Sequence, residues 1–517
     1  MANKQLFQAM RGEFVAPATD TNSEGAAAYG YSSKHLLAQY AVTGCLNNTF
    51  YADGADQLDK VLALSKELNA EFIAKTAVYA REHAFMKDMP ALLLAVLSTK
   101  SPEYLRRVFD RVIDNGRMLR TFVQILRSGA VGRKSLGSAP KALVQNWLSA
   151  ANERRLIEAA VGSDPSLADI VRMVHPKPSD KVREAFYGWL LGKAYAVEDL
   201  PRKLQDYVVY KFDRSQEFPD VPFQMLTALG LKREEWAMVA RRGNWHMVRM
   251  NLNTFARHGV FEIDGMAEIV ADKLRDRVAI EKARVMPYQL LAAFRATGPA
   301  VPAIVREALQ DAMEIALMNI GSFGGRVVVC PDVSGSMQSA ATGMRRGATS
   351  SVRCIDIAGL VAAAVARTNR NALVLPFENS VREIALNMRD SVMTNAEKLA
   401  SIGGGGTNCS APLKWLNARK QQADLVIFVS DNESWVDASK TGSTEMMRQW
   451  SAFKARNAAA KLVCIDIQPN ATSQAAERAD VLNVGGFSDE VFEVVNAFAA
   501  GTLTPGHWIE RIEEVLI

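Results

Sequence analysis

The spacing of apolar residues along the chain changes near residue 320. Before it, apolar residues recur every three or four positions, which places them on one face of an α-helix. Examples are Leu105, Val108, Phe109 and Val112. Beyond it, short apolar runs bounded by turn residues predict buried parallel strands. The pattern therefore predicts a long helical region from Ser33 to about Ile320, followed by a region of alternating strands and helices.

A short fragment recurs within the helical region. Residues 221–226 (VPFQML) return at 286–291 (MPYQLL), with a looser version at 89–94. Proline suits the first turn of a helix, where its missing N–H is not needed, so each fragment predicts a helix start. Antiparallel helix pairs with such starts favour an α-solenoid of HEAT type. The uneven spacing leaves an irregular helical domain as the alternative.

The second region predicts strands at 327–330, 372–377, 425–430 and 462–467 and helices at 355–368, 395–401, 410–419, 443–457 and 488–499. Apolar strands that alternate with helices are typical of a doubly wound parallel sheet, whose ligands bind at the carboxyl ends of the strands. Residues 1–30 show no periodicity. They suit an arm that packs over other elements or stays mobile.

A loop that suits a metal ion follows the first predicted strand. It contains Asp332, Ser334 and Ser336 in a D-x-S-x-S pattern, and alternate residues of an extended loop point their oxygens the same way. A hard divalent cation needs such converging oxygen ligands. Taken alone, the loop is equally compatible with ordinary turn residues. Two later stretches add to it: a glycine run that ends in Thr407, and the apolar run that ends in Asp431.

Together these three stretches resemble the metal-ion-dependent adhesion site of a von Willebrand factor A domain, over roughly residues 321–500. The resemblance implies a divalent cation, most favourably Mg²⁺. Few of its ligands carry charge, so we expect a weak site with exchangeable waters. The implied direct or water-bridged ligands are Asp332, Ser334, Ser336, Thr407 and Asp431.

Several short sequence motifs of the helical region resemble the TROVE module of the Ro ring proteins. They are KHLLAQY at 34–40 followed by NNTFY at 47–51, GRK at 132–134, DIVRMVHPKP at 169–178, and residues 244–259. In that family a helical-repeat module precedes a von Willebrand A domain, as in this chain. The resemblance implies a TROVE module over 1–320, with 1–30 as its arm, and an A domain over 321–517 that closes the repeats into a monomeric ring.

The resemblance also implies a function. Ro proteins bind RNA without catalysis, as scaffolds in noncoding-RNA quality control and processing. The expected partners are a small noncoding Y-type RNA on the outer basic face, single-stranded 3′ ends of misfolded or structured RNAs in a central cavity, and an exoribonuclease tethered through the RNA.

The outer face is predicted around His175. This residue matches the histidine of the family's R-x-x-H-x-K-P word, although a lone histidine is otherwise a core or capping residue. The family's further basic pair has no counterpart here, because residues 158–164 are small and acidic. The residues expected to contact RNA on this face are Arg133, Lys134, Lys141, Arg172, His175 and Lys177.

Two further arginine groups suit phosphate contacts, since guanidinium groups match phosphate oxygens. One is a helical stripe that includes Arg117 and Arg120, for which a solvated face is the alternative. The other contains Arg241, Arg242 and Arg249, interleaved with Trp236 and Phe255. Such mixtures can bind single-stranded RNA. We expect these aromatic residues in the core and the three arginines at the cavity.

Composition agrees with a soluble protein of more than one domain. The chain has 517 residues, more than a single core usually serves, and a net charge of +5, with the basic excess in residues 1–320. No long apolar run or signal-peptide core occurs, which predicts a cytoplasmic protein without a membrane partner. Five scattered cysteines, including Cys45 and Cys330, predict reduced thiols rather than disulfides.

Two other function classes stay open. The A domain could act as a metal-dependent binding or assembly module that takes an acidic side chain of a protein partner into its metal site. A metal-dependent hydrolase is weaker, because the six histidines are dispersed and no nucleophile with a paired base occurs. The single predicted metal site also lacks the second ion of many nucleases.

Overall fold

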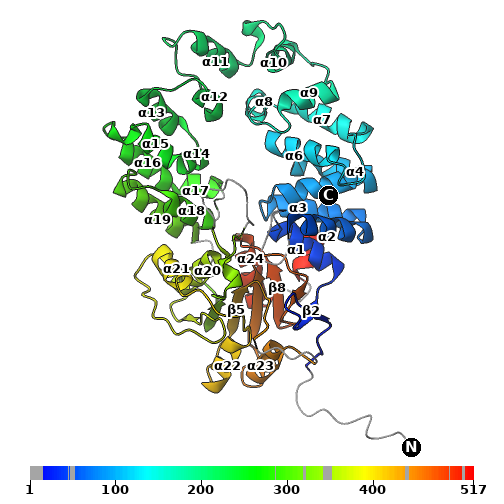
Figure 1. The fold of residues 1–517 in the computed structure, drawn as a ribbon, viewed down its shortest axis with the longest axis vertical. Coiled ribbons are helices and arrows are strands. Elements are labelled where there is room, and N and C mark those ends of the chain that lie inside the picture. Colours follow the sequence, from blue (N-terminus) through cyan, green and yellow to red (C-terminus); the bar gives the residue numbers. More distant parts are fainter. Residues whose placement is uncertain are drawn as a thin grey trace, which may run out of the picture. The chain divides into compact units, whose positions relative to one another are not determined.

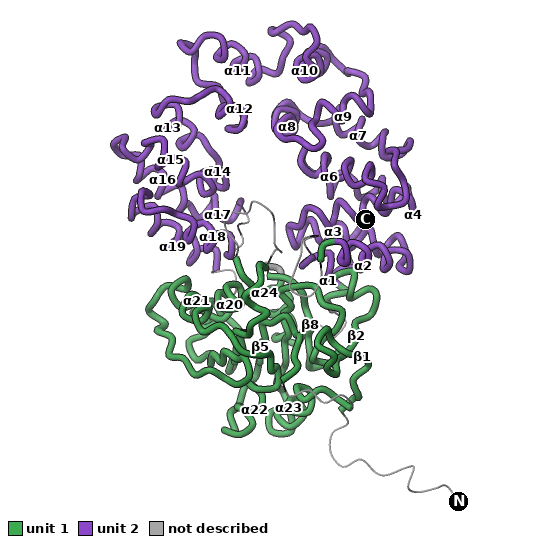
Figure 2. The backbone as a smooth tube through the Cα atoms, in the orientation of Figure 1, with its two compact units in different colours: residues 1–39, 47–54, 318–510 green, residues 40–46, 55–317, 511–517 purple. Residues whose placement is uncertain are grey.

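The computed structural model describes residues 15–44, 46, 53–283, 285, 287–317, 322–341, 352–436, 442–487, 489–502 and 507–517. These form two compact units (Figure 2). The sheet unit comprises the described residues within 1–39, 47–54 and 318–510, and the helical unit comprises those within 40–46, 55–317 and 511–517. The sequence pattern predicts a single boundary at residue 320. The division differs at both ends, because β2 (Ala27–Gly30) pairs with residues 472–473 of the sheet unit, and the carbonyl oxygens of Glu513 and Leu516 accept hydrogen bonds from helices of the helical unit.

The helices of the helical unit follow one another along a curved path (Figure 1). Each packs mainly on its near neighbours, as α3 does on α4 and α5. Closure into a ring stays a prediction. The helices up to residue 317 are α1 (Ser33–Thr43), α2 (Gly54–Glu67), α3 (Ala70–Glu82), α4 (Asp88–Lys100), α5 (Pro102–Val112), α6 (Gly116–Arg127), α7 (Ser138–Ala150), α8 (Glu153–Ala159), α9 (Leu167–Val174), α10 (Lys181–Leu191), η2 (Val197–Asp199), α11 (Arg202–Phe212), α12 (Phe223–Thr227), α13 (Arg233–Arg242), α14 (Trp245–Met250), α15 (Leu252–Arg257), η3 (Val260–Glu262), α16 (Met266–Arg275), α17 (Arg277–Ala283), α18 (Pro287–Ala296) and α19 (Ala303–Leu317).

The predicted helical character of this region is confirmed. No strand occurs among the described residues from 31 to 317. The recurring fragments do begin helices: Pro222 directly precedes α12, Pro287 opens α18, and Pro90 lies in the first turn of α4. The apolar faces of α5 and α6 are buried.

The sheet unit is built on a five-stranded parallel sheet in the order β4-β3-β5-β6-β8, which confirms the predicted architecture. Val328 of β3 pairs with Val426 of β5, which in turn pairs with Leu462 of β6. The strands are β3 (Val327–Pro331), β4 (Leu373–Val374), β5 (Leu425–Ser430), β6 (Lys461–Asp466) and β8 (Val481–Gly485).

Helices cover both faces of this sheet. Trp450 and Phe453 of α23 and Leu413 of α22 share a core with Cys330 and Phe428 of the strands. Helix α20 packs against β3 and β5 and carries α21 on it. The helices of this unit are η5 (Ser336–Gln338), α20 (Cys354–Thr368), α21 (Val392–Ala400), α22 (Ala411–Ala418), α23 (Glu445–Lys454) and α24 (Asp489–Ala500), and α25 (His507–Glu513) follows.

A second, small sheet and strand β8 of the large sheet were not predicted from the sequence. Strand β2 (Ala27–Gly30) pairs antiparallel with β1 (Asp20–Thr21) and with β7 (Thr472–Ser473). Residues 15–30, expected to be an arm, are thus tied to the sheet unit, whereas residues 1–14 lie outside the described residues. Strands of two to four residues are too short to carry a periodic signal. Strand β8 was missed because Asn483 interrupts its apolar run.

The remaining expectations concern thiols, membranes and the end of the chain. Cys330, Cys354, Cys409 and Cys464 are free and buried, whereas Cys45 lies outside the described residues. None of the described helices has the length and apolar character needed to span a bilayer. Near the end of the chain, Lys75 Nζ donates a hydrogen bond to the carbonyl oxygen of Glu513 at 2.7 Å.

Candidate metal centre and nucleic-acid interface

The candidate metal residues gather at the carboxyl edge of the large sheet. Asp332 follows β3 and Asp431 follows the neighbouring strand β5. Parallel strands bring their carboxyl ends together, so the two carboxylates share one edge. The structure buries the side chains of Asp332, Ser334, Ser336, Thr407 and Asp431.

Hydrogen bonds fix the D-x-S-x-S loop around Asp332. The backbone N–H of Ser334 donates to Oδ1 of Asp332 at 2.8 Å. The Ser430 hydroxyl donates to Oδ2 of Asp332 at 2.5 Å. The hydroxyl oxygens of Ser334 and Ser336 lie 3.3 Å apart. Ser334 and Ser430 therefore fix both oxygens of the Asp332 carboxylate, and the hydroxyl groups of Ser334 and Ser336 lie next to each other.

The glycine run brings Thr407 to the same edge. Gly335 N–H donates to the Gly405 carbonyl at 3.0 Å, and Gly404 N–H donates to the Val333 carbonyl at 3.0 Å. Gly404 and Gly405 have positive φ angles of 131° and 77°, a conformation that glycine adopts at little cost. The run therefore follows the metal loop closely.

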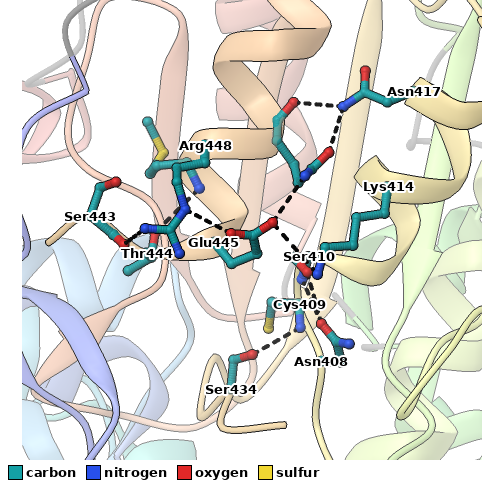
Figure 3. A network of polar contacts seen from close by, with 12 residues as sticks. Asn408, Cys409, Ser410, Lys414, Asn417, Ser434, Ser443, Thr444, Glu445 and Arg448 are labelled. Atoms are coloured by element: carbon teal, nitrogen blue, oxygen red, sulfur yellow. Dashed lines mark hydrogen bonds and ion pairs between the residues drawn. The ribbon is translucent and has the colours of Figure 1, made fainter. Parts of the chain in front are cut away.

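Ser434 ties the residues around Thr407 to the loop after β5 (Figure 3). Its hydroxyl accepts the backbone N–H of Cys409 at 3.0 Å and donates to the Thr407 carbonyl at 3.3 Å. Beyond it, Asn408 Oδ1 accepts from the backbone N–H and the hydroxyl of Ser410 at the start of α22. These bonds fix the loop that carries Thr407.

The electrostatics of the edge fit a divalent cation. Burial, and then the charge of Asp431, raise the pKa of Asp332 to about 7. Burial also raises the pKa of Asp431, while the Ser336 hydroxyl lowers it. Two buried carboxylates that disfavour each other's charge, beside oxygen ligands only, suit Mg²⁺. The described residues contain no cluster of three or more His, Cys, Asp or Glu side chains, so hydroxyl groups must complete the ligand set.

Another buried carboxylate, Asp466 at the end of β6, was not singled out from the sequence. Its Oδ2 accepts from the Tyr31 hydroxyl at 3.0 Å and from Gln39 Nε2 at 2.6 Å. Its Oδ1 accepts from Asn432 Nδ2, and the Asn432 backbone N–H donates to the Ser430 hydroxyl oxygen at 3.0 Å. One continuous chain of hydrogen bonds thus links Asp332 to residues 31 and 39. No local motif signals it.

The structure brings part of the predicted outer RNA-binding group together. Gln145 Nε2 donates to the Val174 carbonyl at 2.6 Å and contacts the His175 carbonyl at 3.4 Å. Lys141 lies one turn before Gln145 on α7, hence on the same helix side. His175 is exposed and caps α9 with a left-handed backbone, φ 50°.

The other members of this group differ in availability. Lys134 and Lys177 are exposed. Arg172 is exposed and makes an ion pair with Asp169 at 3.3 Å. Arg133 is half-buried and donates to the Ser98 and Leu136 carbonyls, so its guanidinium serves the fold. We call Lys134, Lys141, Arg172, His175 and Lys177 the outer basic group.

A cavity of about 830 Å³ lies within the helical unit, between α6 and α8 on one side and α13 and α14 on the other. Arg117 and Arg120 of the predicted stripe line it, although Arg120 also donates to the Ala159 carbonyl at 2.8 Å. Apolar side chains, among them Met247 and Met250, also line it. The cationic and histidine side chains of its wall are Arg117, Arg120, Arg154, Lys203, Arg242 and His246.

Of the three arginines expected at the cavity, Arg242 lines it and the other two do not. Arg242 lines it, while also donating to the Phe218 carbonyl at 2.7 Å. Arg249 does not line it: its guanidinium lies over the Trp245 ring and donates to the Gln289 carbonyl at 2.6 Å. Arg241 is absent from the wall as well, and its Nε contacts the sulfur of Met266. Both were assigned to the cavity because a helical pattern alone does not show which residues neighbouring helices cover. The expected core positions of Trp236 and Phe255 are confirmed.

Comparisons with known proteins agree with this architecture. A family model described as the Ro60 vWA domain matches residues 326–499. The chain is 25% identical over 529 residues to the RNA-binding protein RO60 of Deinococcus radiodurans, a match that covers 93% of this chain and 95% of that protein.

The crystal structure of the Deinococcus radiodurans Ro (RSR) protein superposes with a TM-score of 0.61 at 20% identity, covering 91% of this chain and 100% of that one. At this identity the likeness establishes the fold. The family resemblance found in the sequence is therefore confirmed: residues 326–499 match a von Willebrand factor A domain of the Ro60 type, and over most of its length the chain is similar to the RNA-binding protein RO60.

Proposed function

We propose that this chain is an RNA-binding protein that holds a single-stranded RNA end in the cavity of its helical unit. The observation that carries the proposal is the composition of the cavity wall, where Arg117, Arg120, Arg154, Lys203 and Arg242 stand beside apolar side chains. Cations neutralise the phosphates of a single strand, and apolar side chains contact its bases. The relationship to a protein named for RNA binding supports the same conclusion.

The outer basic group supplies a second contact, for a structured small RNA of the Y type. Its members Lys134, Lys141 and Lys177 offer exposed or half-exposed ammonium groups, which suit phosphates. His175 lies exposed at the end of α9, where the phosphate backbone of an RNA can approach it. In this proposal the protein is a scaffold for noncoding-RNA quality control rather than an enzyme, and an exoribonuclease reaches it through the bound RNA.

A hairpin with a single-stranded 3′ tail, compared with the same hairpin made blunt, tests the cavity. We expect the tailed RNA to bind roughly tenfold tighter or more, because stacking of even one base contributes about 1–3 kcal/mol. Arg117→Gln should reduce this preference. The matched control is Arg277→Gln, which removes an exposed arginine of α17 that pairs with Glu281. Equal affinities for tailed and blunt RNA would refute the proposal.

A second candidate function is a metal-dependent contact with a protein partner. Trp435 is 48% exposed next to the predicted metal loop, and its backbone N–H donates to the Thr407 carbonyl at 3.0 Å. An exposed tryptophan is an uncommon surface feature and favours a protein interface. When bound, Mg²⁺ would supply an open position for an acidic side chain of the partner.

The residues proposed to hold the ion are Asp332, Ser334, Ser336, Thr407 and Asp431. Calorimetric titration of Mg²⁺ into wild type and Asp332→Ala tests the assignment. We expect measurable binding only in the wild type. Unchanged affinity in the variant would show that the ion binds elsewhere.

A further inference from the structure

A hollow of the sheet unit lies beside the glycine run. It has a volume of about 500 Å³ and is lined by residues that include Glu378, Asn379, Arg382 and Gly405. Its position follows from the sheet: Phe377 pairs with Asp332, so Glu378 comes directly after the residue that neighbours the metal loop. The hollow is separate from the candidate metal ligands, none of which lines it.

Glu378 is the distinctive residue of this hollow. Its side chain is 4% exposed, and its Oε1 accepts Nη2 of Arg382 at 2.7 Å. Its Oε2 is buried and has no hydrogen-bond partner among the described residues. A buried carboxylate oxygen without a donor is costly, because it has lost its water without a replacement.

The glycine run leaves space for that oxygen. A Cβ atom added to Gly405 would stand 1.8 Å from Oε2 of Glu378, so no residue with a side chain fits there unless the carboxylate moves. Gly405 also has a positive φ of 77°. The close approach of this carboxylate to the backbone therefore depends on glycine at position 405.

Two other side chains of the hollow, Asn379 and Glu383, have hydrogen-bond partners. Asn379 Oδ1 accepts from Gly406 N–H at 3.1 Å. Glu383 Oε1 accepts from Arg419 and from Trp415 at 3.1 and 3.3 Å. Among the described lining residues, Glu378 is the carboxylate with a buried oxygen that lacks a donor.

We propose that this hollow binds a protonated organic amine, with Glu378 as its anionic acceptor. An ammonium group supplies both the missing donor and a positive charge, and such charge-assisted bonds are the strong ones. A divalent metal fits less well, because it needs about six oxygen ligands and the described residues hold no acidic cluster of three. The volume is also that of a small-molecule or side-chain pocket rather than of one ion.

The full-length protein titrated with butylammonium chloride by calorimetry tests the proposal, with butanol as the uncharged control. Binding of the amine and not of butanol is expected. Glu378→Gln keeps the shape and should weaken binding roughly tenfold or more, the effect of one charge-assisted hydrogen bond. The control Glu383→Gln should change it little, because that carboxylate is occupied by Arg419. No amine binding, or equal losses in the two variants, would overturn the assignment.

Two further variants test whether the amine binds in the hollow or at the neighbouring metal carboxylates. Ile384→Trp should fill the hollow from its lining and abolish binding while Glu378 stays intact. Asp332→Asn should leave amine binding unchanged, and its loss there would place the amine at the metal carboxylates and overturn the proposal. Spermidine and a lysine peptide, each compared with an uncharged analogue, distinguish a free polyamine from a partner's side chain as the natural source.

Discussion

The Ser430 hydroxyl lies 2.5 Å from Oδ2 of Asp332 and donates its hydrogen to it. Ser430 ends the strand that precedes Asp431, so one residue orients the first candidate ligand and positions the last. Ser430→Ala should therefore weaken Mg²⁺ binding by roughly 10- to 100-fold, as is typical when a residue that orients a metal ligand is removed.

The matched control for this prediction is Ser451→Ala. Ser451 is another buried serine of the sheet unit, and its hydroxyl has no hydrogen-bond partner among the described residues. Mg²⁺ affinity, measured by calorimetry, should be unchanged in this variant. Equal Mg²⁺ affinities in Ser430→Ala and Ser451→Ala would show that Ser430 does not orient a metal ligand.

The outer basic group predicts a salt-dependent RNA contact. Lys134→Ala with His175→Ser should weaken binding of a Y-type RNA strongly, and the loss of one lysine contact should reduce the slope of log affinity against log salt by about 0.7–0.9. Gel shifts at several salt concentrations measure both effects. Lys282→Ala, which removes an exposed lysine of α17, is the control. If the double variant bound the RNA as tightly as the wild type, Lys134 and His175 would not belong to the RNA interface.

Arg249 and Arg117 should respond oppositely to the same substitution. Arg249 bonds to the Gln289 carbonyl within the fold, so Arg249→Gln should lower stability by about 1–3 kcal/mol and leave the preference for tailed RNA intact. Arg117 is exposed at the cavity wall. Arg117→Gln should therefore leave stability unchanged and reduce the preference for tailed RNA. Thermal denaturation and the tailed-hairpin gel shift distinguish the two. A loss of tail preference in Arg249→Gln at unchanged stability would reverse the assignment.

Asp466 predicts a pH dependence of stability. Burial raises its pKa well above the usual range, so the folded protein binds this proton more tightly than the unfolded chain does. As the pH rises above about 4, the unfolded pKa of an aspartate, the unfolded state loses its proton first and stability falls. Asp466→Asn should make this fall shallower. Denaturation of metal-free protein at several pH values, in both forms, measures the slope, and identical slopes would contradict the prediction.

The clustering of the candidate metal residues could be predicted because its signals are local. Asp332, Ser334 and Ser336 fall within five positions, and Asp431 follows an unbroken apolar strand. The burial of these side chains also follows from their place at the edge of a parallel sheet. Ser430 was overlooked, since a serine that ends a strand gives no sign of the atom to which it donates.

Contacts between distant segments could not be predicted. Gln39 lies on a helix whose pattern shows an apolar face, yet its amide bonds to Asp466, 427 positions away. Strand β8 was missed because Asn483 looks polar. Its amide is satisfied internally by Ser473 and by the Ala475 carbonyl, which a single sequence does not reveal.

The antiparallel pairing of β2 with β7 sets an order of events during synthesis. The ribosome makes Tyr31 early, and its partner Asp466 follows 435 positions later. At about 5–20 residues per second, the N-terminal segment waits roughly 20 to 90 seconds for the strand that it joins. The helical unit can form during this interval, since it packs mainly through neighbours. The sheet unit, although it holds β1 and β2, is completed only after its last strand, β8, has been made.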